Sequence, residues 1–181
     1  MFEKEFKVML TEEQHDKLVA AYNWDKVFTQ INHYYDTPDL QLSKEHITCR
    51  VRETEGEYFL QLKTPTPKDY IRVEIAKKLP ALPETLTSEM LREVSRYDLP
   101  DVNCIGKLTT LRHVHQFEGG EIDLDRSEYF GKVDYELEIE FTGESAARSM
   151  LAEICELLGI SPESDVCPGK IHRFMDEYSK R

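Results

Sequence analysis

The feature that most limits how this chain can fold is a strict alternation of charged and apolar residues in several short stretches. In the stretch YELEIEF, Glu136, Glu138 and Glu140 alternate with aromatic and aliphatic residues. Successive side chains of a β-strand point to opposite faces, so such a stretch predicts a strand with one charged and one apolar face. The chain is therefore expected to fold around a β-sheet.

About eight stretches predict strands of this kind. They are Phe2–Val8, a segment around His33–Tyr35, Ile47–Arg52, Tyr58–Lys63, Ile71–Lys77, Leu108–Phe117, Glu121–Asp125 and Val133–Phe141. Gly56 and the pair Gly119 and Gly120 lie between neighbouring stretches, where hairpin turns are expected. The predicted sheet is therefore mostly antiparallel.

Helical spacing of apolar residues appears between and after the strands. It predicts helices over Glu12–Tyr22, Ser88–Tyr97, Ser145–Leu158 and Ile171–Tyr178. No change of composition marks a domain boundary, and 181 residues suit one domain. We expect a single α+β domain over residues 1–181.

Charge and composition exclude several function classes. Lys and Arg number 23 against 35 Asp and Glu, a formal net charge of -12, which argues against broad binding to DNA or to an anionic membrane. The four cysteines show no spacing typical of zinc sites or disulfides, and no stretch reaches the ~18 apolar residues of a spanning helix. These observations predict a cytoplasmic protein with reduced thiols.

The charged strand face carries both signs, and two interpretations of it are open. It is either the solvated face of an ordinary antiparallel sheet or the lining of a closed barrel whose apolar side is covered by helices. In a barrel, the basic residues could clamp phosphate oxygens and the acidic residues could bind Mg²⁺ or Mn²⁺. The basic residues are Arg50, Arg52, Lys63, Arg72 and Arg112, and the acidic ones are Glu3, Glu5, Glu136 and Glu138.

Motifs in series favour the barrel. The chain begins with E-x-E-x-K at Glu3, Glu5 and Lys7, and continues through TCRVRE, LQLKTP, IRVEI, LTTLR, IDLD, YELEIEF and PGKIHRF. In this order the motifs resemble the CYTH superfamily, also called triphosphate tunnel metalloenzymes. The resemblance implies a closed eight-stranded antiparallel β-barrel, or tunnel, that binds linear triphosphates with a divalent metal ion and has its helices packed outside.

The resemblance also implies roles for individual residues. It implies that the metal ions are bound by Glu3, Glu5, Asp123, Glu136 and Glu138. It implies that the phosphates are bound by Lys7, Arg50, Arg52, Lys63, Arg72, Arg112 and Lys170. Glu5, Glu138 and Lys63 are the expected catalytic residues, and Glu74, Asp125 and Glu140 are further acids of the tunnel. The implied cofactor is Mg²⁺ or Mn²⁺.

Three function classes stay open for a small-molecule triphosphate ligand. The first is a metal-dependent hydrolase. Its preferred substrate is inorganic tripolyphosphate rather than thiamine triphosphate or a nucleoside triphosphate, because no sequence segment indicates a nucleoside-binding pocket. The second is an adenylate cyclase, and the third is a non-catalytic binder of polyphosphate or a triphosphate. Ala76 and Thr110 stand where many hydrolytic members have Glu and Lys, with Lys107 as a possible replacement for the latter. Either a monomer or a homodimer is compatible with the sequence.

His113 and His115 are the other conspicuous candidates for metal binding. They alternate with Arg112 along the same predicted strand and would therefore lie on the face opposite the charged one. Carboxylates also suit Mg²⁺ better than imidazoles do. We expect neither histidine to belong to the site.

Overall fold

The computed structural model describes residues 5–65, 72–95, 97–161 and 167–181. The chain forms two compact units, one of residues 1–2 and 30–109 and the other of residues 3–29 and 110–181. The strands β2 (Lys26–Asp36) and β7 (Val102–Phe117) each contribute residues to both units. Each unit is described separately below.

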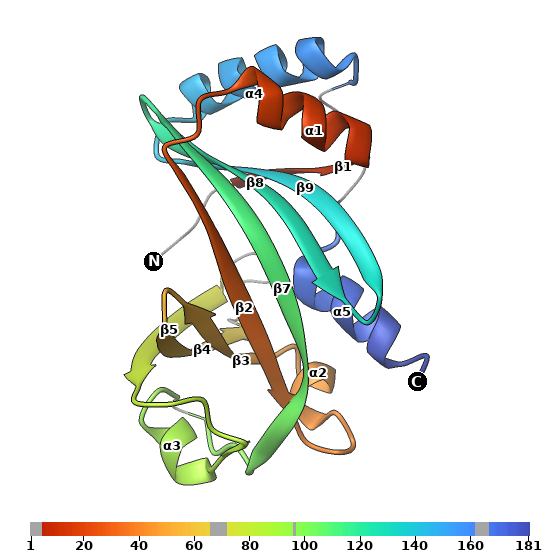
Figure 1. Ribbon diagram of the computed structural model, residues 1–181. Helices are drawn as coiled ribbons and strands as arrows, with labels where there is room; N and C mark the ends of the chain where they lie inside the picture. Colours follow the sequence, from red (N-terminus) through yellow and green to blue (C-terminus); the bar gives the residue numbers. More distant parts are fainter. Residues whose placement is uncertain (1–4, 66–71, 96, 162–166) are drawn as a thin grey trace. The chain divides into compact units, whose positions relative to one another are not determined.

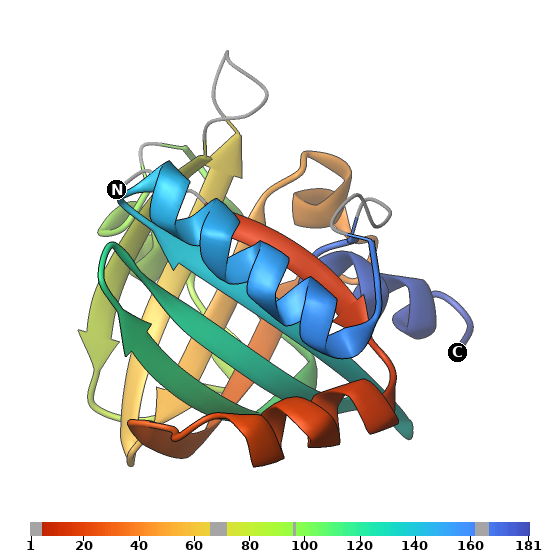
Figure 2. The same ribbon diagram turned by 90° about the horizontal axis from the view of Figure 1, so that it is seen from above.

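The unit of residues 3–29 and 110–181 is an antiparallel sheet with two helices on its apolar face and a third whose cations reach its charged face. Its strands β1 (Glu5–Leu10), β9 (Lys132–Phe141) and β8 (Gly120–Tyr129) follow one another across the sheet, with β7 next to β8. The helices are α1 (Glu12–Ala21), α4 (Glu144–Leu158) and α5 (Lys170–Tyr178). In Figures 1 and 2, α1 and α4 lie beside β1 and β9. Their apolar residues form one core with the outward-facing aliphatic residues of the strands, including Leu18, Leu137 and Ile154.

The unit of residues 30–109 is built in the same way. The strands β2, β3 (Thr48–Thr54), β4 (Glu57–Pro65) and β5 (Arg72–Leu79) are neighbours in this order, and the short β6 (Thr85–Leu86) pairs with β7. Two short helices, α2 (Gln41–Lys44) and α3 (Ser88–Arg92), complete it. Val51, Leu60 and Leu91 are fully buried in its core.

Tight turns with left-handed backbone connect the hairpins. Between β3 and β4, Glu55 and Gly56 have φ values of 50° and 79°, and between β8 and β9, Phe130 and Gly131 have 49° and 80°. Positive φ at both central residues is typical of the type I′ turn, whose twist matches that of the strands. The sequence predicted the first of these turns from Gly56, whereas the turn at Gly131 was not predicted.

The antiparallel α+β fold predicted from the alternation is confirmed, with several changes of extent. The strands β2 and β7 are longer than predicted, and β6 and α2 were not predicted. The predicted helix Ser88–Tyr97 ends at Arg92 because the chain turns there before Leu99 returns to the core. The described strand pairs form a path that ends at β1 and β5, so the expected closure of the barrel is not among them.

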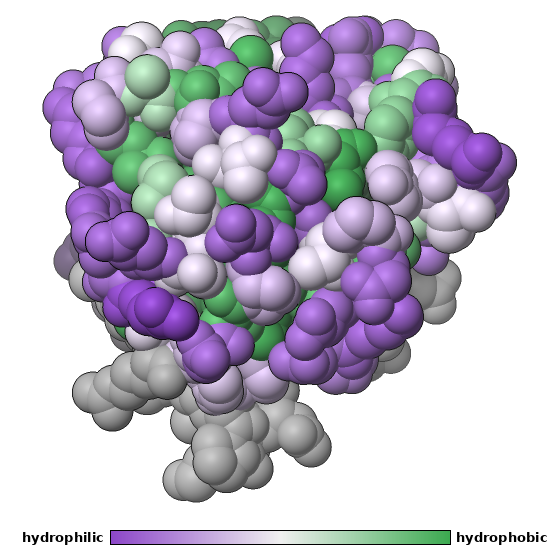
Figure 3. Space-filling model, turned by 90° about the horizontal axis from the view of Figure 1, so that it is seen from below, coloured by the Kyte–Doolittle hydropathy of each residue, from purple (hydrophilic) through white to green (hydrophobic). Residues whose placement is uncertain are grey.

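The molecular surface and the thiols agree with the composition. Hydrophilic side chains cover most of the face shown in Figure 3, with apolar side chains scattered between them. Cys49, Cys104, Cys155 and Cys167 are all free, as predicted. Within the described ranges, no helix has both the length and the apolar character that crossing a membrane requires.

The Asp36 carboxylate is a buried anchor for the segment that follows β2. Its Oδ1 accepts hydrogen bonds from the backbone N–H groups of Thr37 and Leu42 at 2.8 and 2.9 Å. Its Oδ2 accepts from the backbone N–H and the hydroxyl of Ser43 at 3.0 and 2.6 Å.

Asp36→Ala leaves these donors unsatisfied, and we expect the free energy of unfolding to fall by about 3 kcal/mol in urea titrations. The exposed Glu45→Ala is the control, and an equal loss in both variants would contradict the assignment.

Candidate active site

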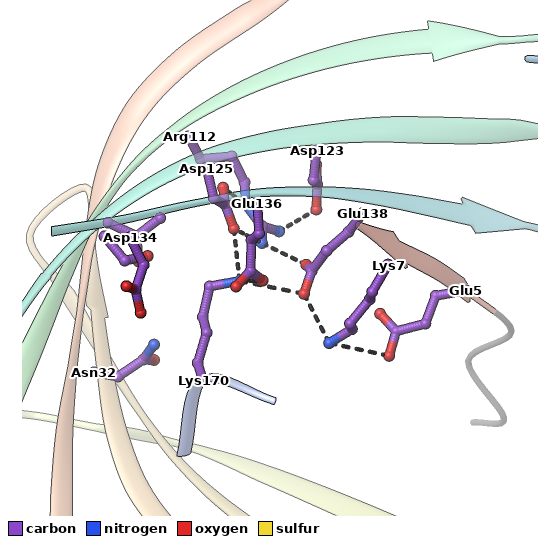
Figure 4. A network of polar contacts seen from close by, with 12 residues as sticks. Glu5, Lys7, Asn32, Arg112, Asp123, Asp125, Asp134, Glu136, Glu138 and Lys170 are labelled. Atoms are coloured by element: carbon purple, nitrogen blue, oxygen red, sulfur yellow. Dashed lines mark hydrogen bonds and ion pairs between the residues drawn. The ribbon is translucent and has the colours of Figure 1, made fainter. Parts of the chain in front are cut away.

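Charged residues of three adjacent strands form rows across one sheet face. Lys7 on β1 lies opposite Glu138 on β9, which lies opposite Asp123 on β8. Glu136 and Asp125 form the next row on β9 and β8. The four acids are at most 5% exposed, although like charges placed opposite one another repel. Figure 4 shows that cations lie between them.

Arg112 on β7 is the first of these cations. Its Nε and one terminal nitrogen donate to the two carboxylate oxygens of Asp125 at 2.8 and 2.7 Å, a bidentate ion pair. The same terminal nitrogen lies 2.9 Å from Glu138, and the other donates to Asp123. Arg112 therefore joins acids of two strands through the planar fork of its guanidinium.

Lys170, the first residue of α5, is the second cation. Its ammonium lies 2.8 Å from Asp125 and 3.2 Å from Glu138, and also contacts Glu136. Burial by itself would lower the pKa of Lys170, but these carboxylates raise it above its ordinary value. Lys170 is therefore charged and neutralises Asp125 and Glu136, the acids of the second row.

Lys7 on β1 completes the group from the outer side. Its ammonium lies 2.8 Å from Glu138 and 3.2 Å from Glu5, and its side chain is 24% exposed. Glu138 is thus shared by Lys7, Arg112 and Lys170, as the dashed lines of Figure 4 show. This carboxylate is the centre of the cluster.

Glu138 and Asp123, which lie opposite each other on β9 and β8, differ in their electrostatic environment. Burial acts to raise the pKa of Glu138, yet its three neighbouring cations hold it well below the usual range. The pKa of Asp123 is raised to about 8. Burial is the largest cause, the nearby acids also raise the pKa, and Arg112 acts to lower it. Glu138 is therefore ionised at neutral pH, whereas Asp123 is mostly protonated there.

Two groups of carboxylates have a geometry suited to a divalent cation. Oxygens of Glu5, Glu138 and Glu140 lie within 4.8 Å of one another, and so do oxygens of Asp125, Glu136 and Glu138. Oxygen donors are the ligands that Mg²⁺ and Mn²⁺ prefer, so both groups fit such an ion. Of the predicted metal ligands that the structure describes, Asp123 belongs to neither group.

The other unit carries a second, basic face. Arg50, Arg52 and Lys63 share one side of β3 and β4, where Arg50 Nε donates to Gln61 at 2.7 Å. Arg52 Nε donates to Oδ1 of Asn32 at 3.1 Å. The structure therefore gathers these three predicted phosphate-binding residues on one face.

Some predicted site residues lie outside what the structure describes. Glu3 is outside the described residues, and of Arg72 and Glu74 only the backbone, in β5, is described. At the two positions that depart from the family pattern, Ala76 lies opposite Gln61 and the Thr110 hydroxyl bonds that of Ser127 at 2.9 Å. A buried neutral pair thus stands where many members have a lysine.

Arg173 on α5 belongs to the same network and was not predicted. Its Nε donates to Asp134 at 2.8 Å, and a terminal nitrogen contacts Glu136. Residues three apart lie on the same side of a helix, so the spacing from Lys170 was a usable signal. His113 is buried on the other side of β7, beside His15 and Trp24, and stays outside the cluster as predicted.

The family model of the CYTH domain matches residues 1–167. The chain belongs to the CYTH family. Its curated relative "Putative triphosphatase YjbK" from Bacillus subtilis (strain 168) is 32% identical over 188 residues, covering 98% of this chain and 96% of that protein. The resemblance inferred from the motifs is therefore confirmed.

Solved structures of CYTH proteins agree with this assignment. A protein from Bacillus halodurans described as a "putative adenylate cyclase" is 29% identical, with a TM-score of 0.73 and coverage of 96% of this chain and 99% of that one. The HpAC1 protein from Hippeastrum, described as having a dominant triphosphatase activity, is 20% identical with a TM-score of 0.75, covering 97% and 96%. Both share the CYTH fold, and relatives of this chain bear the names of triphosphatases and cyclases.

The position of the Lys170 ammonium generates a prediction for metal binding. Lys170→Met leaves Asp125, Glu136 and Glu138 without their common cation, and we expect a loss of about 3–5 kcal/mol of stability. A divalent cation can replace the ammonium, so Mg²⁺ should raise the unfolding midpoint of Lys170→Met more than that of the wild type. Differential scanning calorimetry with Mg²⁺ and with chelator measures this difference. Lys132→Met, which removes an ion pair with Glu177 on the half-exposed side of β9, is the control. An equal Mg²⁺ shift in all three proteins would contradict the prediction.

Proposed function

We propose that this protein is a metal-dependent hydrolase of linear triphosphates, with inorganic tripolyphosphate as a substrate. The observation that carries the proposal is the buried cluster in which Lys7, Arg112 and Lys170 interleave with four carboxylates. A solvated sheet face has no need to bury so many charges, since each buried charge costs free energy unless it is paired. Such an arrangement is suited to a ligand that carries many negative charges together with metal ions.

The basic residues would grip the phosphate chain. Lys7 is the most exposed cation of the cluster, and its ammonium can exchange a carboxylate contact for a phosphate oxygen. Arg112 holds its guanidinium in a fixed orientation through Asp125, which favours directed hydrogen bonds to phosphate. We assign Arg50, Arg52, Lys63 and Arg72 to phosphate binding as well, with Lys63 neutralising charge that develops during the reaction.

The metal ion, Mg²⁺ or Mn²⁺, would be held by carboxylates of β1 and β9. An ammonium lies among the oxygens of each group, that of Lys7 in one and that of Lys170 in the other. We favour Glu5, Glu138 and Glu140, because Lys7 is 24% exposed and can turn toward a phosphate, whereas Lys170 is 11% exposed. We assign Glu3 to the same end of the site from its position in the E-x-E-x-K motif. When bound, the ion would withdraw charge from the phosphate oxygens and so favour attack of water on the phosphorus.

Glu138 is the residue that we assign to orienting the attacking water. Its low pKa keeps it ionised, so it accepts a hydrogen bond from water at neutral pH. Water then adds to a terminal phosphorus, the P–O bond to the neighbouring phosphate breaks, and tripolyphosphate yields diphosphate and orthophosphate. Because phosphoryl transfer depends mostly on positioning and charge neutralisation, no nucleophile from the protein is needed.

The relatives support the proposal and suggest one alternative. The Bacillus subtilis relative bears the name of a triphosphatase and matches this chain over nearly its whole length. The Bacillus halodurans protein bears the name of an adenylate cyclase, so cyclic AMP formation from ATP is the second candidate. The products separate the two activities. In either case we place the protein in the cytoplasm.

The deciding measurement is release of orthophosphate from tripolyphosphate, ATP and thiamine triphosphate with Mg²⁺, with Mn²⁺ and with chelator. We expect metal-dependent release by the wild type and a loss of about 100-fold or more in kcat/KM in Glu138→Gln, which keeps the side-chain shape but removes the charge. Analysis of the ATP reaction for cyclic AMP tests the cyclase in the same experiment.

The control is Glu128→Gln, a change of the same chemistry on β8. Glu128 is exposed and pairs only with Arg126 among the contacts described for its side chain. The kcat/KM of the Glu128→Gln variant should stay within a few-fold of the wild-type value. Absence of turnover by folded wild-type protein would overturn the hydrolase, and equal loss in both variants would overturn the role of Glu138.

A further inference from the structure

Helix α1 is held on the sheet by few buried side chains, and one of them can be protonated. Of its ten residues, His15 and Leu18 are the buried ones. Leu18 belongs to the apolar core of this unit, whereas His15, which is 4% exposed, places a polar ring in the same interface. The docking of α1 therefore involves an imidazole at a position where a helix usually buries an apolar side chain.

A second buried histidine faces His15 from the sheet. His113 on β7 is 9% exposed, and the centres of the two imidazole rings lie 6.1 Å apart with their planes at 76°. The centre of the Trp24 ring lies 5.4 Å from that of His113, and the centre of the Tyr135 ring lies 5.0 Å from that of His15. The two imidazoles thus lie among aromatic rings where α1 meets the apolar face of the sheet.

Each imidazole has one nitrogen that the fold leaves without a partner. Nε2 of His15 and Nδ1 of His113 are buried and have no hydrogen-bond partner among the described residues. Nδ1 of His15 lies 3.1 Å from a carboxylate oxygen of Asp16. A neutral imidazole has one nitrogen that carries no proton, whereas both nitrogens of an imidazolium are donors. Protonation of either ring would therefore bury a positive charge and an N–H group for which no described residue is the acceptor.

The charged groups near His15 lie toward the solvent. The side chain of Asp16 on α1 is 71% exposed, so its attraction for a charged imidazole is weak. Glu12, also exposed on α1, accepts a hydrogen bond from the Tyr135 hydroxyl of β9 at 2.9 Å. Arg126 on β8 interacts with the same hydroxyl and brings a positive charge, which repels another one. These groups give little compensation to a charge inside the interface.

The surroundings of His113 favour its neutral form. Burial is the largest cause that lowers its pKa below the ordinary value of 6.5, and the neighbouring His15 lowers it further. Asp125 and a hydrogen bond with the Leu124 backbone act to raise the pKa. Asp125, however, lies on the opposite face of the sheet, where Arg112 already holds it in a bidentate ion pair.

We propose that His15 and His113 form an acid-sensitive latch, which holds α1 on the sheet while both rings are neutral and loosens it when either ring is protonated. The pKa of His113 is lower in the folded protein than in the unfolded chain, so the unfolded chain binds the proton more readily. The stability that the neutral ring contributes is therefore present above pH 6.5 and is lost as the pH falls from that value through the lowered pKa. The latch needs no substrate and does not depend on the proposed function.

Trp24 makes the latch observable, because it is the one tryptophan of the chain and lies against His113. A protonated imidazole quenches the fluorescence of a neighbouring indole more than a neutral one does. We expect the emission of the wild type to fall between about pH 8 and about pH 5, with a midpoint below 6.5. His113→Gln, which keeps a neutral polar side chain, should remove this transition. Far-ultraviolet circular dichroism at each pH shows whether the chain is folded.

Hydrogen exchange tests whether α1 is the element that loosens. Protection factors of the amides, corrected for the intrinsic pH dependence of exchange, are compared between α1 and α4, which packs in the same core. Between about pH 7.5 and about pH 5.5, we expect the protection of α1 in the wild type to fall about 10-fold or more relative to that of α4. His113→Gln should show a smaller fall. The wild-type comparison decides the proposal even if this variant does not fold.

His115→Gln is the matched control on the same strand. Nδ1 of His115 lies 3.0 Å from the carbonyl oxygen of Asn23 and 3.3 Å from a carboxylate oxygen of Asp25, so its protonated ring has acceptors. This variant should keep both the fluorescence transition and the fall in α1 protection. Equal loss of protection in α1 and α4 of the wild type, or an emission that does not change with pH, would overturn the latch. Loss of the transition in His115→Gln as well as in His113→Gln would also contradict it.

Discussion

The interaction on which the site depends is the mutual neutralisation of buried carboxylates and buried cations. Asp125 and Glu138 share Arg112 and Lys170, and neither acid is more than 5% exposed. Removing one partner from such a group leaves a buried charge uncompensated, which is strongly destabilising. The sheet can therefore hold this many acids on one face because β1, β7 and α5 bring cations to it.

The same balance is the reason why we propose a triphosphate and metal ions as ligands of the site. A divalent cation and a polyanion can exchange with the internal ion pairs without leaving a large net charge behind. Glu138 contacts three cations, whereas one oxygen of Asp123 has no hydrogen-bond partner among the described residues.

Much of the fold could be predicted because alternation in a strand determines which side chains share a face. Parity placed Glu136 and Glu138 on one face of their strand, Lys7 on the charged face of its own strand, and His113 on the side opposite Arg112. The family resemblance, not parity, predicted that these charged faces meet. The lengths of β2 and β7 were less predictable, since their polar residues interrupt the pattern. Arg173 was missed although its spacing of three residues from Lys170 was a usable signal, whereas the position of α5 against β9 depends on tertiary packing.

The sequence by itself determined the class of fold, the charged strand face and the family, because strand periodicity and motif order are properties of the chain. The tertiary structure decided the partners of each charge. The register of β8 against β9 sets Asp123 opposite Glu138, and α5 brings Lys170 to acids more than thirty residues away in sequence. Such contacts depend on packing between elements, which local sequence patterns do not encode.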